Sequence, residues 1–444
     1  MKKFLSLIIF LFMLCITVEA KSLSHSLNSV INHSQISNNS VSISIKNLDT
    51  GEKIYTLNDK ILIHPASVQK MLTIVPIVET LGYDYKFSTE LYKREKNGYL
   101  IKLGADPYLS TSDLETLIKN IDDSAINKIY IDDTIIEQKD WGEGWQWDDD
   151  LNALMPRFNS YNLDDNKIKI TITKTEPGRQ ALIINPSKYP LVFYNNVTTG
   201  DKNDIKISRD NITASNALKL DGIVSTSVTR YIPNNNLKRY FNFKLTNALE
   251  ERRIYLKAAY EYTSKNNNDN KVAEVVHSLE SAINDIFKNS NNMTIETMNK
   301  LAANKYYKKT GTDIDGLKLI NQYYNKIGLN TSRIRLVDAS GVSKNNLVDS
   351  DFVSEFLIKN KDSKVLSYLA SPGEGTLTHR LLPLKNVLKA KTGTLSDISS
   401  IAGYITSKNG HHYAFCIMIN DPASGESAKK MLEDYILREI YFNG

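Results

Sequence analysis

Hydrophobic and polar residues follow two different periods along this chain, and both occur near its beginning. Residues 41–45 alternate between apolar and polar side chains, which is typical of a half-buried strand. A turn at 47–51 separates them from a second strand-like stretch at 54–57, so the two stretches predict a β-hairpin. Beyond Ser67 the apolar residues recur at helical spacing, which predicts a helix that ends near Gly82.

Between residues 87 and 270 the pattern changes to short alternating stretches that Gly, Asn and Asp interrupt. This pattern is typical of a β-rich domain with exposed loops. We therefore predict an inserted β-rich domain at 88–270, with two nested subdomains, between the two parts of another domain at 21–87 and 271–444. The strands expected in the insert are 99–103, 128–132, 168–173, 181–184, 191–194, 205–207 and 223–229.

Helical spacing returns from Val272 and continues, with breaks, through much of the remaining chain. Two strand-like stretches and a closing helix at 426–440 follow near the end. We expect this last helix to pack on the terminal strands, and attachment to a membrane surface is the alternative. The other elements expected here are helices at 272–287, 293–307 and 317–327, a glycine-bearing turn at 338–343, and strands at 398–405 and 413–419.

The first twenty residues have the pattern of a secretion signal. Two lysines precede an almost wholly apolar stretch at 4–18, and Val18 and Ala20 occupy the two positions that signal peptidase reads. The apolar stretch is short for a bilayer span, which favours a cleaved signal peptide at 1–20 over a retained anchor. We therefore expect an exported protein, in the periplasm or elsewhere outside the cytoplasm, with peripheral membrane association left open.

The composition excludes several classes of function. The 444 residues, 41% of them hydrophobic, are enough for two or three domains with substantial cores. A net charge of +5 without basic and aromatic patterning does not indicate nucleic-acid binding. Beyond the expected signal peptide Cys416 is the only cysteine, and the seven histidines show no metal-ligand spacing. We therefore expect no disulfide, no metal site and no other cofactor.

Ser67 and Lys70 are the first candidates for catalytic chemistry. Residues three apart share a helix face, so the Lys70 ammonium group is expected beside the Ser67 hydroxyl. A serine becomes a good nucleophile only when a base takes its proton, and a lysine whose pKa is lowered by burial can do so. The same spacing also arises by chance, as at Ser427 and Lys430, which we interpret as a solvated helix face. The pair therefore needs further partners.

Two further motifs follow in the order that β-lactamases and penicillin-binding proteins use, first Ser-x-Asn and then Lys-Thr-Gly. Both motifs recur in this chain, so their context must choose between the copies. Lys391 begins a Lys-Thr-Gly between two apolar strands, whereas Lys309 lies at what we predict to be a solvated helix end. Ser290 lies in a short break between two helical stretches, where a polar loop can face a cleft. Ser343, in a turn of its own, is the rival to Ser290.

Taken together, these motifs resemble a known family, the class C low-molecular-mass penicillin-binding proteins. These are D-alanyl-D-alanine carboxypeptidases and endopeptidases of the penicillin-binding protein 4 type. The 223 residues between Ser67 and Ser290 match the large insert of this family, which simple β-lactamases lack. Asn289, Ala105 and Ala339 depart from residues that are common in the family. The resemblance rests on the segments 65–70, 81–87, 104–109, 144–149, 288–293, 338–343, 375–377 and 390–395.

The resemblance implies a fold and an activity. The fold is of the α/β class, more narrowly α+β. It combines a transpeptidase-like domain, with an antiparallel sheet flanked by helices as in β-lactamases and DD-peptidases, and the β-rich insert. The activity is hydrolysis of peptidoglycan stem peptides that end in D-Ala-D-Ala, with β-lactam antibiotics as covalent inhibitors. A β-lactamase of the same ancestry and a non-catalytic peptidoglycan-binding scaffold are the alternatives.

The resemblance also implies catalytic roles. Ser67 is the nucleophile that attacks the penultimate carbonyl, with Lys70 as its base. Ser290 relays a proton to the leaving amine, and Asn292 orients Lys70 and the substrate amide. The backbone N–H groups of Ser67 and Thr394 form the oxyanion hole.

Substrate binding is implied for the Lys-Thr-Gly segment and for one residue of the insert. Lys391, with the hydroxyls of Thr392 and Thr394, holds the terminal carboxylate of the peptide through charge-assisted hydrogen bonds. Gly393 completes this segment. By the same analogy, Asp149 meets the amine of the third stem-peptide residue.

Overall fold

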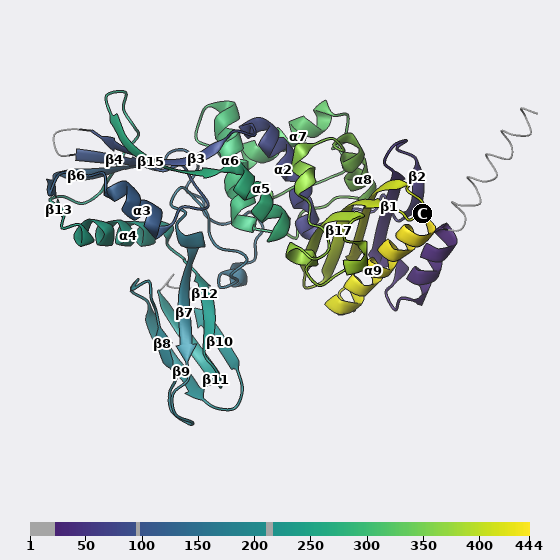
Figure 1. The fold of residues 1–444 in the computed structure, drawn as a ribbon, viewed down its shortest axis with the longest axis horizontal. Helices are drawn as coiled ribbons and strands as arrows, with labels where there is room; N and C mark the ends of the chain where they lie inside the picture. The colour runs from purple at the N-terminus through teal and green to yellow at the C-terminus, as the bar shows by residue number, and fades with distance from the viewer. Residues whose placement is uncertain (1–22, 95–97, 210–215) are drawn as a thin grey trace, which may run out of the picture. The chain divides into compact units, whose positions relative to one another are not determined.

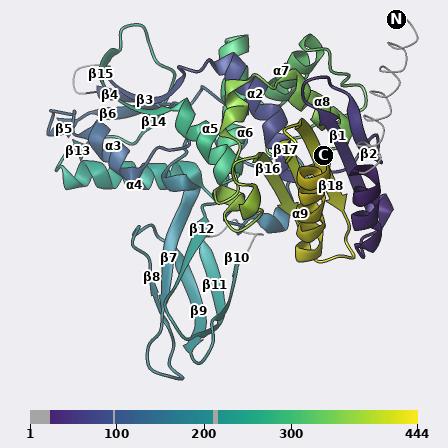
Figure 2. The same ribbon diagram turned by 45° about the vertical axis from the view of Figure 1, so that its right-hand side comes forward.

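The computed structural model describes residues 23–94, 98–209 and 216–444 (Figure 1, Figure 2). The predicted signal peptide at 1–20 lies outside the described residues. The chain divides into two compact units. The predicted insert at 88–270 falls within the second unit, although the predicted domain boundaries themselves stay a prediction. The first unit contains the described residues up to Thr80, Ala282–Asn291 and Leu317–Gly444, and the second contains Leu81–Ser281 and Asn292–Gly316.

The first unit is built on one antiparallel sheet with the strand order β16-β17-β18-β1-β2 (Figure 2). In its register Ile43 pairs with Ile417 and Thr392 pairs with Ile401, so segments from both ends of the chain share one sheet. The predicted hairpin and the predicted terminal strands are confirmed. The strands are β1 (Val41–Asn47), β2 (Lys53–Leu57), β16 (Leu388–Leu395), β17 (Ile398–Thr406) and β18 (His412–Asn420).

Strand β1 is buried on both faces. The alternation of its apolar and polar residues had instead predicted a strand with one buried and one solvated face. Its apolar residues point into a hydrophobic core on one face of the sheet. On the other face the hydroxyls of Ser42 and Ser44 form hydrogen bonds of 2.8 Å and 2.7 Å with Ser350 and Ser354 of α8 (Ser350–Lys359). Small hydroxyl side chains that bond each other can be buried at little cost, and this is why a polar stripe lies under a helix.

Helix α9 (Glu426–Asn443) covers the apolar face of the sheet, as predicted for the closing helix. Its buried Ile436 shares one core with Leu27, from the helix at 23–33, and with Ile43 of β1. Within the described part of the chain, no helix is long and apolar enough to cross a membrane. The other helices that lie wholly or largely in this unit are α2 (Gln69–Leu81), α5 (Leu279–Lys288) and α7 (Asp313–Lys326), with 3₁₀ turns η1 (Asn38–Ser40), η2 (Ala66–Val68), η5 (Lys364–Tyr368), η6 (Gly375–Leu377) and η7 (Leu382–Leu384).

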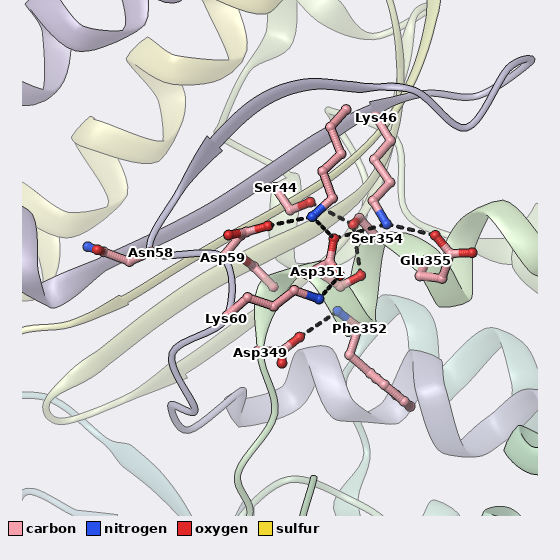
Figure 3. A network of polar contacts seen from close by, with 12 residues as sticks. Ser44, Lys46, Asn58, Asp59, Lys60, Asp349, Asp351, Phe352, Ser354 and Glu355 are labelled. Atoms are coloured by element: carbon pink, nitrogen blue, oxygen red, sulfur yellow. Dashed lines mark hydrogen bonds and ion pairs between the residues drawn. The ribbon is translucent and has the colours of Figure 1, made fainter. Parts of the chain in front are cut away.

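A network of ion pairs fastens α8 to the β1–β2 hairpin (Figure 3). The Asp351 carboxylate on α8 receives three ammonium groups, those of Lys46 at 3.1 Å, Lys53 at 2.9 Å and Lys60. Lys46 also pairs with Glu355 at 2.7 Å, and only 3% of the Lys46 side chain is exposed. Because a buried charge is costly without a partner, the Lys46 ammonium group keeps α8 against the sheet.

The second unit is rich in β-strands, as predicted, and the α+β class is confirmed. Its sheets have the orders β14-β6-β4-β3-β15, β12-β7-β8, β10-β11-β9 and β13-β5. Helix α6 (Asn292–Tyr307) lies where a helix was predicted. The strands are β3 (Lys86–Lys93), β4 (Gly98–Lys102), β5 (Ala125–Ile126), β6 (Lys128–Asp132), β7 (Lys167–Thr173), β8 (Leu182–Ile184), β9 (Val192–Thr199), β10 (Asp204–Arg209), β11 (Ala217–Val224), β12 (Val228–Pro233), β13 (Tyr255–Leu256), β14 (Glu261–Tyr262) and β15 (Asn270–Ser278), with 3₁₀ turns η3 (Trp147–Asp149) and η4 (Asp164–Asn166).

The prediction of a helix from Val272 was wrong for its first part. Residues up to Ser278 form β15, which pairs antiparallel with β3, and α5 begins only at Leu279. Ala273 and Val275 are half-buried and alternate with exposed residues, which is the period of a strand. Several valines in this stretch also fit a helical spacing, and only the pairing with β3 decides between the two.

One further prediction for this unit was wrong. The expected strand at 223–229 is the end of β11 and the start of β12, which are separate strands. Helices α3 (Thr111–Ile118) and α4 (Leu237–Glu251) lie in the segment that was predicted to be β-rich. The sequence carried a signal for α3, because Ser110 and Asp113 form a reciprocal capping box at its N-terminus.

Candidate active site

Ser67 lies in the 3₁₀ turn η2, which leads directly into α2. The residue before it, Ala66, has a φ of +47°, in the left-handed region that residues with a Cβ rarely adopt. Lys70 is fully buried, and its ammonium group donates hydrogen bonds to the Ser67 hydroxyl at 2.8 Å and to the Ser340 carbonyl at 2.8 Å. The structure thus brings together the serine and the lysine that the Ser-x-x-Lys spacing predicts to be neighbours.

The glycine-bearing turn after α7 holds the second acceptor of Lys70. The Asp338 carboxylate accepts hydrogen bonds from the backbone N–H groups of Gly341 at 2.7 Å and of Ser343 at 2.6 Å. A carboxylate that bonds two N–H groups of one turn fixes the course of its backbone. The Ser340 carbonyl belongs to the same peptide unit as the Gly341 N–H and is thereby directed at the Lys70 ammonium group.

Lys391, the lysine of the Lys-Thr-Gly sequence, lies fully buried in β16. Its ammonium group donates to the Ser290 hydroxyl at 3.0 Å and to the Thr392 carbonyl at 2.7 Å. Burial and, second to it, the charge of Lys70 lower the pKa of Lys391 well below its ordinary value. A bound anion would favour the charged form of both lysines, so the site is suited to a negatively charged ligand.

Gly393 allows β16 to approach the candidate nucleophile. A Cβ at this position would lie 2.7 Å from the Ser67 backbone nitrogen, 2.9 Å from the Ala66 Cβ and 2.4 Å from the Ser400 hydroxyl. Carbon atoms do not approach other atoms so closely, so any larger residue would force the strand away. The glycine of Lys-Thr-Gly therefore keeps the backbone of β16 against Ser67.

The two threonines of this segment have different surroundings. The Thr392 hydroxyl donates to the Thr376 hydroxyl at 2.6 Å, and Thr376 belongs to η6. Thr394, two residues further, is exposed. Since β16 is the edge strand of its sheet, an extended peptide can lie along it and meet these side chains.

Asn292 and Asp149 are the predicted site residues that belong to the second unit. Asn292 begins α6, and its side-chain amide donates to the Leu154 carbonyl at 2.8 Å. Asp149 ends η3 and is half-buried, next to an exposed aspartate, Asp148. The catalytic role of Asn292 and the binding role of Asp149 stay predictions.

The rival copies of the Lys-Thr-Gly and Ser-x-Asn motifs lie in surroundings that differ from those of Lys391 and Ser290. Lys309 is 58% exposed and pairs with Asp315 at 2.7 Å, as expected for a solvated helix end. Ser343 is fully buried, and its hydroxyl accepts a hydrogen bond from the Asn345 N–H at 3.4 Å. Of the two candidate serines, Ser290 is the one whose hydroxyl bonds the lysine of Lys-Thr-Gly. The geometry therefore favours Ser290 for the second motif.

Three residues at this site were not predicted from the sequence as site residues. Ser340 contributes only a backbone carbonyl, and Thr376 contributes one hydroxyl to Thr392. Both lie in segments that carry the family resemblance, which was the available signal. His64 precedes the Ser-x-x-Lys motif and is 5% exposed, and no spacing or motif distinguishes it in the sequence.

Ser67, Lys70, Ser290 and Lys391 thus form one polar cluster in the first unit. A lysine bonds the first hydroxyl, and a second lysine bonds the second hydroxyl. This arrangement suits nucleophilic attack by a serine on a carbonyl group next to an anionic group. Among the residues that the structure describes, no group of His, Cys, Asp and Glu side chains has the arrangement of a metal site.

Comparison with known proteins supplies independent information. A model of the D-Ala-D-Ala carboxypeptidase 3 (S13) family matches residues 23–438. The D-alanyl-D-alanine carboxypeptidase DacB of Haemophilus influenzae is 24% identical over 417 residues, which are 87% of this chain and 86% of the relative. A D-alanyl-D-alanine carboxypeptidase of Actinomadura sp. (strain R39) is 25% identical over 438 residues, which are 89% of this chain and 80% of the relative.

Solved structures show the same fold. The crystal structure of penicillin binding protein 4 (dacB) from Haemophilus influenzae matches with a TM-score of 0.79 at 22% identity, over 90% of this chain and 96% of that one. The same protein complexed with a β-lactam matches with a TM-score of 0.75 over the same shares of the two chains. A penicillin G acylated endopeptidase from Bdellovibrio bacteriovorus matches with a TM-score of 0.50 at 15% identity, over 90% of this chain and 91% of that one.

Proposed function

The chain belongs to the D-Ala-D-Ala carboxypeptidase 3 (S13) family, and from this premise we propose that Ser67 carries the acyl intermediate of its reaction. The protein is a serine-type D-Ala-D-Ala carboxypeptidase or endopeptidase that acts on peptidoglycan. The observation that carries the proposal is the hydrogen bond of 2.8 Å from the buried Lys70 ammonium group to the Ser67 hydroxyl. This bond supplies the path by which the hydroxyl proton can leave.

Acylation in this proposal proceeds by addition and elimination. The Ser67 oxygen forms a bond to the penultimate D-alanine carbonyl carbon, while Lys70 in its neutral form takes the hydroxyl proton. The tetrahedral intermediate then collapses and the peptide C–N bond breaks. The proton that Lys70 took is relayed through the Ser290 hydroxyl to the leaving amine of the terminal D-alanine, so that Lys70 is neutral again. Water attacks the resulting ester, and its hydrolysis returns the Ser67 hydroxyl.

We propose that the Lys-Thr-Gly segment binds the terminal carboxylate of the substrate. Lys391 and the hydroxyls of Thr392 and Thr394 would bond the carboxylate of the terminal D-alanine. The lowered pKa of Lys391 supports this role, because an arriving carboxylate compensates the cost of a buried ammonium group beside Lys70. The exposed Thr394 at the edge strand is accessible to such a substrate.

Stabilisation of the transition state is proposed for backbone N–H groups. The N–H groups of Ser67 and Thr394 would both donate to the oxyanion, and one such donor is worth about 3 kcal/mol. The close approach of β16 to the Ser67 backbone nitrogen at Gly393 supports this arrangement.

Roles for two residues of the second unit complete the proposal. Asn292, two residues after Ser290, would orient Lys70 and the substrate amide. Asp149 would meet the amine of the third stem-peptide residue through a charge-assisted contact. The family membership supports both roles.

We propose that the protein acts outside the cytoplasm and that β-lactams acylate it. The signal-like segment at 1–20 supports export. β-Lactam binding is known from structures of relatives, the Haemophilus influenzae protein in complex with a β-lactam and the Bdellovibrio bacteriovorus endopeptidase acylated by penicillin G. The same Ser67 would attack the β-lactam carbonyl, which stands in for the peptide carbonyl.

The test is labelling of the purified mature protein with fluorescent penicillin, followed by peptide mass mapping and a parallel assay of D-alanine release. We expect a persistent adduct on Ser67 and release of D-alanine from a peptide that ends in D-Ala-D-Ala. Ser67→Ala should abolish both signals while the protein keeps its thermal unfolding transition. Labelling of Ser67→Ala at the full rate would overturn the assignment of the nucleophile.

The alternatives give different outcomes in the same experiment. A transient adduct with fast hydrolysis of the drug would indicate a β-lactamase. A folded protein that forms no adduct and releases no D-alanine would indicate a scaffold that has lost its chemistry.

A further inference from the structure

His64 is a buried histidine three residues before the proposed nucleophile, and 5% of it is exposed. Its Nδ1 atom accepts a hydrogen bond from the Ala66 backbone N–H at 3.0 Å, and its Nε2 atom lies 2.6 Å from the Ser343 carbonyl oxygen. A backbone N–H can only donate, and a carbonyl oxygen can only accept. These two neighbours are therefore satisfied together only by neutral His64 with its proton on Nε2.

The residue that His64 bonds has an unfavourable backbone conformation. Ala66 has a φ of +47°, which costs a residue with a Cβ free energy and persists only where the surroundings enforce it. Its neighbours do so on several sides. The Pro65 carbonyl accepts a hydrogen bond from the Ser400 hydroxyl at 2.7 Å, and a Cβ at Gly341 would lie 2.0 Å from the Ala66 carbonyl oxygen.

The hydrogen bond from the Ala66 N–H closes a turn of the kind that asparagine and aspartate side chains make. In that turn a side-chain acceptor bonds the backbone N–H two residues further along the chain. Here the acceptor is the imidazole Nδ1 atom. Ser67 follows immediately, so the direction of its N–H and its hydroxyl depends on how the Ala66 peptide is held.

We propose that neutral His64 is a positioning residue that holds the Ala66 peptide in its left-handed conformation and so presents Ser67 for acylation. This inference rests on the proposed function, because it takes Ser67 as the acylated residue. His64 itself touches neither the reacting atoms nor the substrate in this scheme. It acts through the one peptide that separates it from the nucleophile.

Protonation of His64 reverses the contact with Ala66. The added proton occupies Nδ1, so that two donors face each other and the hydrogen bond is lost. Burial lowers the pKa of His64 below its ordinary value of 6.5, and the charge of Lys344 lowers it further, whereas the Ser343 carbonyl and Asp338 act in the opposite direction. His64 is therefore neutral above pH 6.5, and the positioning contact is lost only as the pH falls below that value.

Three substitutions separate positioning from general damage. His64→Asn keeps an acceptor for the N–H two residues on, and it cannot be protonated in this range. His64→Gln keeps a donor that can reach the Ser343 carbonyl but places no acceptor at the Ala66 N–H. His33→Asn changes an exposed histidine of the helix at 23–33 and is the matched control.

The measurement is the acylation rate constant with fluorescent penicillin from pH 4.5 to pH 8, at saturating and at low drug concentration, with a thermal unfolding curve at each pH. At pH 7.5 we expect His64→Asn to acylate at nearly the wild-type rate and His64→Gln about tenfold more slowly, with the loss in the rate at saturation. As the pH falls from 7.5 to 4.5, the ratio of the wild-type rate to the His64→Asn rate should fall, because only the wild-type protein loses the contact by protonation. The ratio of the wild-type rate to the His33→Asn rate should stay constant over this pH range.

Two outcomes would overturn the inference. One is a ratio of wild-type to His64→Asn rates that does not change with pH while both proteins are folded. The other is equal acylation by folded His64→Gln and folded His64→Asn, which would show that the acceptor is irrelevant. Failure of the proposed function is distinct, because the wild-type protein would then form no adduct on Ser67 at any pH.

Discussion

At the scale of single residues, the site consists of two buried lysines that each bond a serine hydroxyl. Lys70 bonds Ser67 and Lys391 bonds Ser290, and each ammonium group also donates to a backbone carbonyl. A buried ammonium group is costly unless acceptors surround it, so these carbonyls are what allow both lysines to lie inside the protein. The lowered pKa of Lys391 indicates that these carbonyls offset only part of the cost of burying its charge. This is expected of a site that takes an anionic ligand.

Ser290→Ala and Ser343→Ala test which serine belongs to the second motif. Ser290 bonds Lys391, so its loss removes the proposed proton relay, and D-alanine release should fall about a hundredfold or more. Ser343 is buried in its turn and bonds the Asn345 N–H, so its replacement should change activity less than about threefold and act mainly on stability. Steady-state kinetics and thermal unfolding of both variants provide the measurement. Loss of turnover in Ser343→Ala alone would show that Ser343 is the relay.

The residues that the sequence could single out for the site are those that short motifs place at a fixed spacing. Ser67, Lys70 and Lys391 belong to short motifs, and the sequence around each copy was enough to choose among the copies. Ser340 accepts a hydrogen bond at its backbone carbonyl, and His64 accepts one from the backbone N–H of Ala66. Any residue type can offer a carbonyl, and a histidine outside a motif has no characteristic spacing, so neither role leaves a pattern in a single sequence.

At the scale of elements, helix α8 and the β1–β2 hairpin depend on each other through buried polar contacts. Ser42 and Ser44 of β1 bond hydroxyls of α8, and the Asp351 carboxylate binds Lys46 and Lys53 of the hairpin. These contacts explain why a strand with alternating polarity is buried on both faces. The alternation alone predicts one solvated face, because it cannot show that a polar stripe meets complementary hydroxyls and charges.

Asp351→Asn tests this network through the pH dependence of stability. Burial alone would raise the pKa of Asp351, but hydrogen bonds from Lys60 and Lys53 and the charge of Lys46 hold it well below its usual range. The carboxylate therefore stabilises the fold fully above its unfolded pKa of about 4, and this contribution is lost as the pH falls toward the lower folded pKa. At pH 7 we expect Asp351→Asn to lower the free energy of unfolding by about 2 kcal/mol in urea titrations, since it leaves Lys46 with less compensation.

The difference between wild type and Asp351→Asn should shrink as the pH is lowered from 5 to 3, because the wild-type carboxylate becomes protonated in the unfolded chain. Asp49→Asn, in the exposed turn of the same hairpin, is the matched control and should change stability little at any pH. A deficit that is equal at pH 7 and pH 3 would show that the packing of Asp351, and not its charge, is what matters.

The type of an element could be predicted where its apolar residues follow a single spacing. The prediction failed where they fit both a helical and an alternating spacing. The strands β17 and β18 and the helix α9 have unmixed patterns and were predicted correctly. In β15 valines fit both a helical and an alternating spacing, and its pairing with β3 decides in favour of the strand. That partner lies far away in the sequence, so no local window contains the deciding information.

At the scale of the whole molecule, each compact unit collects segments that are distant in the sequence. The first unit joins the beginning of the chain, the short segment Ala282–Asn291 and the end of the chain. The division between the units falls after Asn291, inside the Ser-x-Asn motif, so that Ser290 belongs to one unit and Asn292 to the other. Periodicity indicated a β-rich segment between two stretches of helical spacing, but it could not predict this division, because the residues of a motif do not show where a compact unit ends.

The final prediction concerns where the working protein begins. The segment at 1–20 has a basic start, an apolar stretch at 4–18 that is short of the about 20 residues a membrane span needs, and small residues before its end. Leu23, the first residue that the structure describes, is buried in the core of the first unit and follows the predicted cleavage site by three residues. Expression of the full chain in a Gram-negative host should yield a periplasmic protein whose N-terminal residue is Lys21, as read by intact-mass and N-terminal peptide analysis. Ala20→Phe, which places a large residue where signal peptidase requires a small one, should leave the precursor uncleaved and membrane-bound. A wild-type protein that keeps residues 1–20 and fractionates with the membrane would instead establish a retained anchor.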